Sequence, residues 1–235
     1  MWVKICGNTN LEDAQLAVQL GADAVGFVFA PSPRQVAASQ VAAITPHLPA
    51  RVERIGVFHS RDAEQIAAIA LEAGLTAVQL HGGLDEDLAQ RLAERFDGSV
   101  QIIQTLHWTV VRPSPHVPTS PTTESPAALL TTQIKRIAEL RLSDRILIDS
   151  KVGAATGGTG IPFDWTAARS VFASAPSTVH LIVAGGLNPE NVAHAIAQLG
   201  PWGVDVSSGV EAAPGRKDPA LLASFIFNAR AAATP

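Results

Sequence analysis

The stretch Gly21-Ala22-Asp23-Ala24-Val25-Gly26-Phe27-Val28-Phe29 decides the fold class, because it joins the end of a helix to an apolar strand. Gly21 is typical of a residue that closes a helix. The strand from Ala24 to Phe29 is almost continuously apolar, and strands of this kind are covered on both faces, as in a parallel sheet. The stretch therefore predicts one unit of an α/β fold.

The same pattern recurs along the whole chain, with helical stretches between the apolar segments. The other predicted strands are Val3 to Cys6, Arg54 to Phe58, Ala77 to His81, Val100 to Thr105, Arg145 to Asp149, Val179 to Ala184 and Gly203 to Val206. Eight β units, most of them followed by a helix, predict a single (β/α)8 barrel over residues 1–235. A doubly wound open sheet is the alternative, but it usually has fewer strands and needs a topological switch point.

The predicted helices carry end signals. Thr9 or Asn10 is expected to cap the helix that Gly21 closes, and Asp62 is expected to cap a later helix. The pair Asn188-Pro189 predicts a further helix start, with Asn as the N-cap and Pro at the first helical position.

Length and composition narrow the class of protein. The 235 residues suit one barrel, and the net charge of −4 does not indicate nucleic acid or anionic lipid as a partner. A single cysteine excludes an internal disulfide and a cysteine-based metal cluster, which fits a reducing cytosol. The first residues lack the features of a signal peptide, and no apolar run reaches the ~18 residues of a membrane span. We therefore expect a cytoplasmic protein.

One segment interrupts the regular pattern. Residues 109–126 contain five prolines mixed with serine and threonine, so they are unsuited to helix or central strand. The segment follows the fifth predicted strand and so belongs to the C-terminal face of the barrel. It is interpreted as an extended surface insertion, and the alternative is a partial lid over the site.

Three glycine-rich turns follow the last three predicted strands. Glycine lets backbone N–H groups approach an anion closely, and barrels often build a phosphate site from these loops. The predicted phosphate-binding residues are Gly158, Gly185, Gly186, Ser207, Ser208 and Gly209. The chain has neither a P-loop nor a dinucleotide fingerprint, so a sugar phosphate is a better candidate than a nucleotide.

Two residues at predicted strand ends are candidates for acid–base chemistry. Cys6 ends the first strand, where a barrel keeps its chemistry, although a free cysteine is also commonly a small buried apolar residue. Asp149 follows the apolar run Ile146-Leu147-Ile148. It is either a cap for the next loop or a general acid whose pKa is raised by desolvation.

Four more polar residues are candidates for the site. Arg34 suits bidentate capture of a carboxylate, although a surface arginine is the common alternative. Lys4 shares the parity of Cys6 and is expected to face the barrel interior, where Asp205 offers it a partner. That pair is either structural or also lowers the pKa of the thiol. His81 either lines the site or is a core histidine, and the other histidines show no metal-ligand spacing, so no metal site is predicted.

These residues stand within motifs through which the chain closely resembles the phosphoribosylanthranilate isomerase family. The resemblance runs from end to end except for the proline-rich insertion. The matching motifs are Lys4-Ile5-Cys6-Gly7, Gly21 to Phe29 with Ser32-Pro33-Arg34, Val78-Gln79-Leu80-His81-Gly82, Gly157-Gly158-Thr159-Gly160 with Phe163-Asp164-Trp165, Ala184-Gly185-Gly186-Leu187-Asn188-Pro189-Glu190-Asn191, Val204-Asp205-Val206-Ser207-Ser208-Gly209-Val210-Glu211, Pro214-Gly215 and Lys217-Asp218.

The resemblance implies a (β/α)8 barrel that catalyses an Amadori rearrangement in tryptophan biosynthesis. The implied substrate is N-(5-phosphoribosyl)anthranilate and the implied product is 1-(2-carboxyphenylamino)-1-deoxyribulose 5-phosphate. The family's general base corresponds to Cys6, its general acid to Asp149 and its anthranilate-contacting arginine to Arg34. Its phosphate loops correspond to the glycines and serines named above. The reaction needs no cofactor, and such enzymes are monomers or homodimers.

Two departures from the family pattern stand out. Asn8 occupies a position that is usually bulky and apolar, and the insertion lies beside the site. The remaining alternatives are another aminosugar-phosphate isomerase and a non-catalytic barrel that binds a sugar phosphate. Cys6 and Asp149 argue against both.

Overall fold

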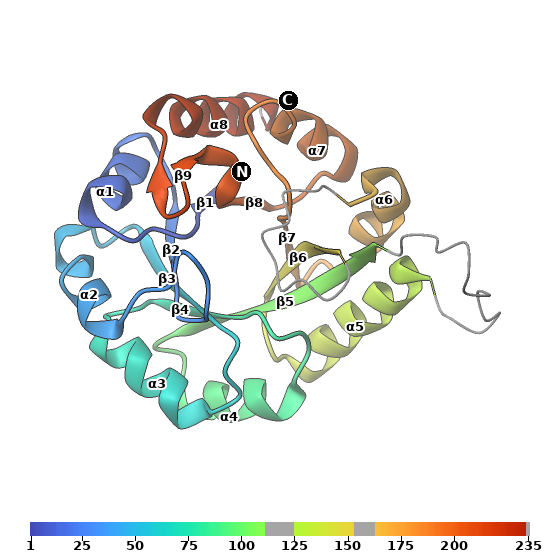
Figure 1. The fold of residues 1–235 in the computed structure, drawn as a ribbon. Helices are drawn as coiled ribbons and strands as arrows, with labels where there is room; N and C mark the ends of the chain where they lie inside the picture. Colours follow the sequence, from blue (N-terminus) through green and yellow to red (C-terminus); the bar gives the residue numbers. More distant parts are fainter. Residues whose placement is uncertain (111–124, 153–162, 234–235) are drawn as a thin grey trace, which may run out of the picture.

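The computed structural model describes residues 1–110, 125–152 and 163–233. Within these residues eight parallel strands form a closed barrel in chain order, in which β1 also pairs with β8 (Figure 1). The strands are β1 (Trp2–Ile5), β2 (Ala24–Val28), β3 (Glu53–Phe58), β4 (Ala77–Leu80), β5 (Gln101–Val110), β6 (Arg145–Val152), β7 (His180–Val183) and β8 (Gly203–Val206). The predicted (β/α)8 barrel is confirmed.

A ring of helices surrounds the barrel (Figure 1). The helices are α1 (Leu11–Gln19), α2 (Ala38–Ala42), α3 (Ala63–Glu72), α4 (Glu86–Phe96), α5 (Pro126–Leu140), α6 (Trp165–Ala173), α7 (Val192–Leu199) and α8 (Pro219–Ala232). Short 3-10 turns lie at Thr45–His47 and Ser208–Val210, and the hairpin strands β9 (Glu211–Ala213) and β10 (Arg216–Lys217) precede α8. Among the described helices, none has the length and apolar character needed to cross a membrane.

Side-chain caps explain where several helices begin. Asn10 accepts a hydrogen bond from the Asp13 N–H at the start of α1, and Asp62 caps α3 in the same way. The helix start predicted at Asn188 is wrong, because α7 begins three residues later with Asn191 as its N-cap. The Asn188 side chain instead accepts from the N–H groups of Glu190 and Asn191, which forms a local turn that competes with the helix.

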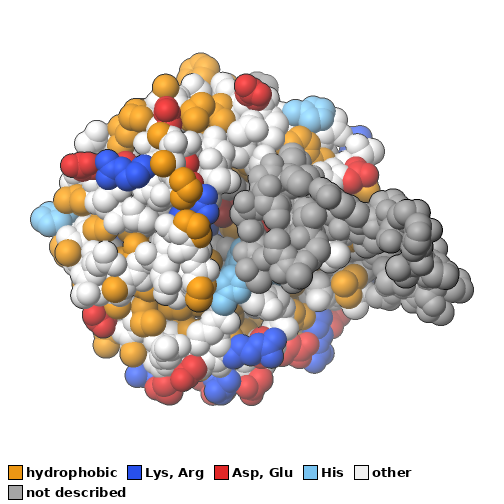
Figure 2. All heavy atoms as spheres, viewed as in Figure 1, with side chains coloured by type: hydrophobic (Ala, Val, Ile, Leu, Met, Phe, Trp, Pro, Cys, Tyr) orange, Lys and Arg blue, Asp and Glu red, His pale blue; other side chains and the backbone are white. Residues whose placement is uncertain are grey.

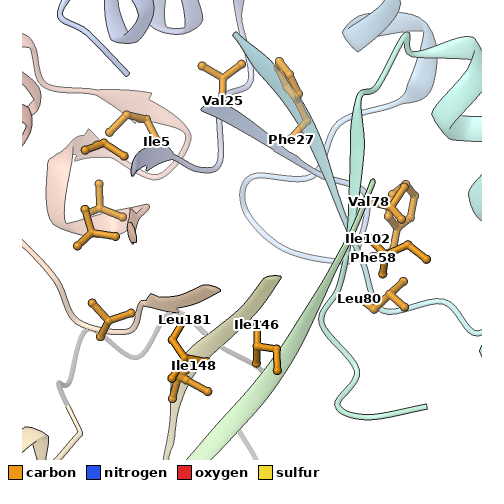
Figure 3. Packing of buried hydrophobic residues seen from close by; sticks show 14 of the residues in the cluster. Ile5, Val25, Phe27, Phe58, Val78, Leu80, Ile102, Ile146, Ile148 and Leu181 are labelled. Atoms are coloured by element: carbon orange, nitrogen blue, oxygen red, sulfur yellow. The ribbon is translucent and has the colours of Figure 1, made fainter. Parts of the chain in front are cut away.

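The core has two parts, one on each side of the sheet. Outward-facing strand residues such as Ile5, Val25 and Ile146 pack under the helices (Figure 3). A smaller cluster fills the barrel interior and consists of Trp2, Ala24, Ile55, Ala77, Ile103, Leu147, Ile182 and Ala184. Since strand residues alternate between the two faces, the next inward positions toward the C-terminal ends belong to the same interior.

Several of those next inward positions are polar. Lys4, Gln79, Thr105 and Asp205 come from β1, β4, β5 and β8, and all four side chains are buried. A polar layer inside an otherwise apolar barrel is costly unless its groups are paired. It therefore marks the level at which the apolar core ends and the site begins.

The two strands beside the predicted insertion are longer than expected. β5 and β6 continue to pair past the rest of the barrel, from His107 opposite Asp149 to Val110 opposite Val152. Thr109, which was assigned to the insertion, is thus the penultimate residue of β5, and Pro126 is the first residue of α5. Val110 ends β5 and Ser125 is the N-cap of α5, while residues 111–124 of the predicted insertion lie outside the described residues.

Candidate active site

A cavity of about 420 Å³ opens at the C-terminal ends of the strands. In Figure 2, basic and histidine side chains reach the surface in the middle of the face shown, beside the grey atoms. The lining residues of the cavity come from seven of the eight strands or from the loops that follow them, and they include Cys6, Arg34, His81, Asp149, Gly185 and Ser207. The structure therefore brings most of the predicted site residues to one place.

Cys6 lies one residue beyond β1 and is held there by its N–H, which donates to the Val206 carbonyl at 2.8 Å. Burial raises the pKa of the Cys6 thiol above its ordinary value, while the positive charges of Lys4 and Lys217 act against this rise. The sequence left open whether the pair of Lys4 and Asp205 is only structural or also lowers the pKa of the thiol. Lys4 does act to lower this pKa, but the Asp205 carboxylate acts to raise it, and the burial of the sulfur outweighs the effect of Lys4.

Lys4 lies beneath the cavity and is fully buried. Its ammonium donates to Gln79 Oε1 at 2.7 Å and to Asp205 Oδ2 at 3.1 Å. Burial acts to lower the pKa of Lys4, but Asp205 and the adjacent Cys6 together raise it, so the ammonium stays charged. The expected pair with Asp205 thus forms, and Gln79 joins it as a partner that sequence reasoning missed.

Asp149 lies within β6, three residues before the end of the strand rather than at its end. Burial, together with the nearby Asp205 carboxylate, raises the pKa of Asp149 to about 7, against the opposing effects of the Ser150 N–H and Lys4. A carboxyl group with this pKa is suited to donate a proton near neutral pH. The Asp149 side chain lines the cavity.

A group of histidines surrounds Asp149. His81 Nε2 lies 3.4 Å from Asp149 Oδ2, and the His59 and His107 rings each lie about 5 Å from the His81 ring. One ligand atom from each of His81, His107 and Asp149 lies within 4.8 Å of the others. Sequence spacing did not indicate this set, because its members come from β4, β5 and β6. By residue type it is able to hold a transition metal.

Arg34 is already engaged inside the protein. Its Nε and Nη2 donate to the two carboxylate oxygens of Glu211 at 2.8 and 2.7 Å. Lys217 donates to the same carboxylate at 3.0 Å and also to the Cys6 carbonyl. These cations hold the pKa of Glu211 below its ordinary value against the effect of its burial. Arg34 is therefore a positioned side chain at the cavity, and Glu211 and Lys217 are supporting residues to which sequence reasoning gave no role.

The glycine-rich turns after β7 and β8 form one side of the cavity. Gly185 and Gly186 have φ angles of +82° and +68°, which favour glycine, and they line the cavity with Ser207 and Ser208. Gly209 lies behind them, and a Cβ there would lie 1.9 Å from the Leu187 carbonyl oxygen. This glycine thus lets the two turns approach each other. Gly158 lies outside the described residues.

Known proteins match this chain in sequence and in fold. The family model described as N-(5'-phosphoribosyl)anthranilate isomerase matches residues 3–120 and 123–228. The chain belongs to the N-(5'-phosphoribosyl)anthranilate isomerase family. As a member of this family it is an isomerase of tryptophan biosynthesis.

Individual relatives match over nearly their whole length. The isomerase of Thermotoga neapolitana is 39% identical over 97% of this chain and 98% of its own, and that of Rubrobacter xylanophilus is 38% identical over the same shares. The crystal structure of the Thermotoga maritima isomerase is 38% identical, covers 98% of this chain and 99% of its own, and has a TM-score of 0.78. A further isomerase structure, 37% identical with a TM-score of 0.75 over 98% of this chain and 99% of its own, is a complex with reduced 1-(o-carboxyphenylamino)-1-deoxyribulose 5-phosphate.

Proposed function

We propose that Cys6 and Asp149 are the general base and the general acid of the rearrangement of N-(5-phosphoribosyl)anthranilate to 1-(2-carboxyphenylamino)-1-deoxyribulose 5-phosphate. The observation that carries this proposal is that both side chains line one cavity, where the pKa of Asp149 is about 7. An acid and a base that reach the same substrate are what the reaction requires.

The first proton transfer is assigned to Asp149. Its carboxyl proton passes to the furanose ring oxygen of the substrate, the bond between that oxygen and C1 breaks, and a Schiff base forms with the anthranilate nitrogen. Burial supports this role, because it keeps the carboxyl group protonated at a pH where an exposed aspartate is ionised.

The second proton transfer is assigned to Cys6. Its thiolate removes the proton from C2 of the Schiff base, which gives an enolamine that tautomerises to the ketone product. The fully buried Lys4 ammonium supports this role, because it lies next to the sulfur and favours the thiolate. Each transfer is expected to contribute about 10²–10⁴-fold to the rate.

The remaining site residues are assigned to substrate binding. Arg34 is proposed to bind the anthranilate carboxylate, since Glu211 holds its guanidinium at the cavity. The phosphate is proposed to bind the turns that contain Gly185, Gly186, Ser207 and Ser208, with Gly209 behind them and Gly158 as a further contributor. Lys4 and Asp205 support the site from below.

We further propose that the protein works in the cytoplasm and as a monomer or a homodimer. The free Cys6 thiol fits a reducing compartment. One matching structure is of monomers derived from a dimeric isomerase of Thermotoga maritima. We therefore propose either a monomer or a homodimer for this chain. Sedimentation velocity on the purified chain distinguishes them.

Replacing Asp149 with Asn tests the proposed acid. The variant Asp149→Asn is expected to lose at least about 10²-fold in kcat, because an amide does not donate the required proton. Asp144→Asn is the matched control, since Asp144 is exposed and lies outside the cavity. Full activity of Asp149→Asn would contradict the assignment. A wild-type protein that binds the sugar phosphate without turnover would instead be a binding module.

A further inference from the structure

We propose that His81 is a positioning residue for Asp149, and that Gln79 fixes the His81 tautomer in which Nε2 carries the proton. This inference rests on the proposed role of Asp149 as the general acid. It gives a role to Gln79, which is buried, and to His81, which is half-buried; both residues line the cavity.

The orientation of the Gln79 amide is the first step of the argument. Its oxygen accepts from the Lys4 ammonium at 2.7 Å, and an ammonium has only donors to offer. The Gln79 nitrogen therefore points the other way, toward Thr105 Oγ1 at 3.2 Å and His81 Nδ1 at 3.2 Å. A flipped amide would place its N–H groups against the ammonium. Lys4, which also contacts Asp205, therefore determines that the nitrogen of the Gln79 amide faces His81.

The His81 tautomer follows from this orientation. Because the Gln79 nitrogen is a donor, His81 Nδ1 must accept, and in the neutral ring the proton is then on Nε2. That N–H faces Asp149 Oδ2 at 3.4 Å. The same argument disfavours a metal ion between His81, His107 and Asp149, because a metal on Nε2 would need a proton on Nδ1, opposite the Gln79 donor.

With His81 in this tautomer, the two carboxylate oxygens of Asp149 have different roles. Oδ2 lies 3.4 Å from the His81 nitrogen to which the proton is assigned, so we assign the acceptor role to Oδ2 and the transferable proton to Oδ1. Oδ1 is the oxygen beside Gly185, where a Cβ would lie 2.6 Å from it. Gly185 lines the cavity. His81 therefore presents the acidic oxygen toward the substrate side and stabilises the carboxylate that remains after the proton has left.

The ring has other polar neighbours, which an experiment must take into account. The His59 ring and the His107 ring lie 5.0 and 5.1 Å from the His81 ring, on the β3 and β5 sides. His107 Nε2 also lies 3.0 Å from the His81 carbonyl oxygen. Among the described charged groups, Asp149 lies 3.4 Å from His81 Nε2, Gln79 links the ring to the Lys4 ammonium, and Asp205 and Lys4 both act on Asp149.

Nitrogen-15 NMR of the histidine rings in the wild-type protein tests the tautomer without any turnover. We expect the His81 signal, assigned by its disappearance in the spectrum of His81→Gln, to show a protonated Nε2 and an unprotonated Nδ1 near pH 7.5. A protonated Nδ1 would overturn the proposal. Gln79→Glu is expected to place a proton on Nδ1, because a carboxylate keeps the Lys4 contact and offers His81 an acceptor. An unchanged ring spectrum in that variant would also contradict it.

Kinetics test the consequence for Asp149. His81→Leu is expected to lower kcat by about 10-fold or more with little change in KM, because the acid is then less well placed. His81→Gln is expected to retain most of the rate, since its amide N–H can replace Nε2–H. Equal losses in both variants, or none in His81→Leu, would overturn the proposal. The exposed His47→Leu is the control for the substitution itself, and melting temperatures report on folding. Failure of the acid assignment would show separately, as activity in Asp149→Asn.

Discussion

The Arg34 guanidinium and the Glu211 carboxylate, 177 residues apart in the chain, form a bidentate ion pair beside the cavity. The pair uses Nε and Nη2 of the arginine, and within the described residues Nη1 has no hydrogen bond to the protein. Arg34 also sits against Gly7, where a Cβ would lie 2.7 Å from Arg34 Cδ. The arginine is therefore held ready for a ligand.

Arg34→Ala is expected to raise KM by about 10-fold or more and to change kcat less, because a charge-assisted contact to the anthranilate carboxylate is lost. Glu211→Gln is expected to raise KM by a smaller factor, since the guanidinium remains but is held more loosely. Steady-state kinetics measure both. An unchanged KM in Arg34→Ala would mean that the carboxylate binds elsewhere.

The pKa values of the acid and the base predict an unusual pH profile. The pKa of Asp149 is about 7, and the pKa of Cys6 is raised above its ordinary value of 9.0. In the proposed mechanism the active form has a protonated Asp149 and an ionised Cys6. Its population rises with pH up to about 7, stays level, and falls only above the pKa of the thiol.

We therefore expect kcat/KM to rise with pH up to about 7 and to stay flat toward pH 9. The measurement is kcat/KM at closely spaced pH values in buffers of constant ionic strength. A profile that already declines just above pH 7 would place the pKa of Cys6 below that of Asp149 and would contradict this assignment.

The raised pKa of Asp149 also links stability to pH. Between 3.8 and about 7 the folded protein keeps a proton that the unfolded chain has lost, so the free energy of unfolding falls as pH rises across that window. The slope is at most about 1.4 kcal/mol per pH unit. Asp149→Asn removes the titrating carboxyl group and therefore this loss of stability at high pH. The variant is expected to melt at a higher temperature than wild type at pH 8. The difference is expected to vanish near pH 3.5. Equal melting temperatures at both pH values would contradict a buried, protonated carboxyl group.

Gly26 is predicted to be essential for the placement of the base. A Cβ at this position would lie 2.8 Å from the Cys6 sulfur and 2.9 Å from Lys4 Cε. Gly26→Ala is therefore expected to displace both side chains and to lower kcat by about 10-fold or more. Gly82→Ala is the control, because among the described residues, apart from its chain neighbours, the nearest atom to its Cβ would be the His59 carbonyl oxygen at 3.9 Å. A kcat for Gly26→Ala equal to that of the control would show that the exact position of the sulfur matters little.

Much of the fold could be predicted because the strands are apolar on both faces and the helices carry caps such as Asn10 and Asp62. The strand ends were less predictable. β5 and β6 extend past the barrel because they pair with each other, from His107 opposite Asp149 onward. Such mutual pairing leaves no signal in either segment alone. At Asn188 a local turn and a helix cap compete for the same side chain, and the turn forms.

The candidate site could be predicted in part for a related reason. Cys6 follows β1 directly, Asp149 follows an apolar run within β6, and Arg34 lies in the loop after β2; the C-terminal ends of parallel strands meet on one face. The contacts between Gln79, His81 and Asp149 could not be predicted, because they depend on adjacent strands and on the orientation of one amide. The direction of the Cys6 pKa shift could not be decided from the sequence, because burial depth is a property of the folded barrel.

The most direct test of the central claim is the turnover of N-(5-phosphoribosyl)anthranilate, generated in situ from anthranilate and phosphoribosyl pyrophosphate and followed by fluorescence, in wild type and in Cys6→Ser. The wild type is expected to consume the substrate signal. Cys6→Ser is expected to be slower by about 10²-fold or more, because a hydroxyl group is a poor base near pH 7. Turnover of Cys6→Ser at the wild-type rate would contradict the assignment of the base and, with it, the proposed mechanism.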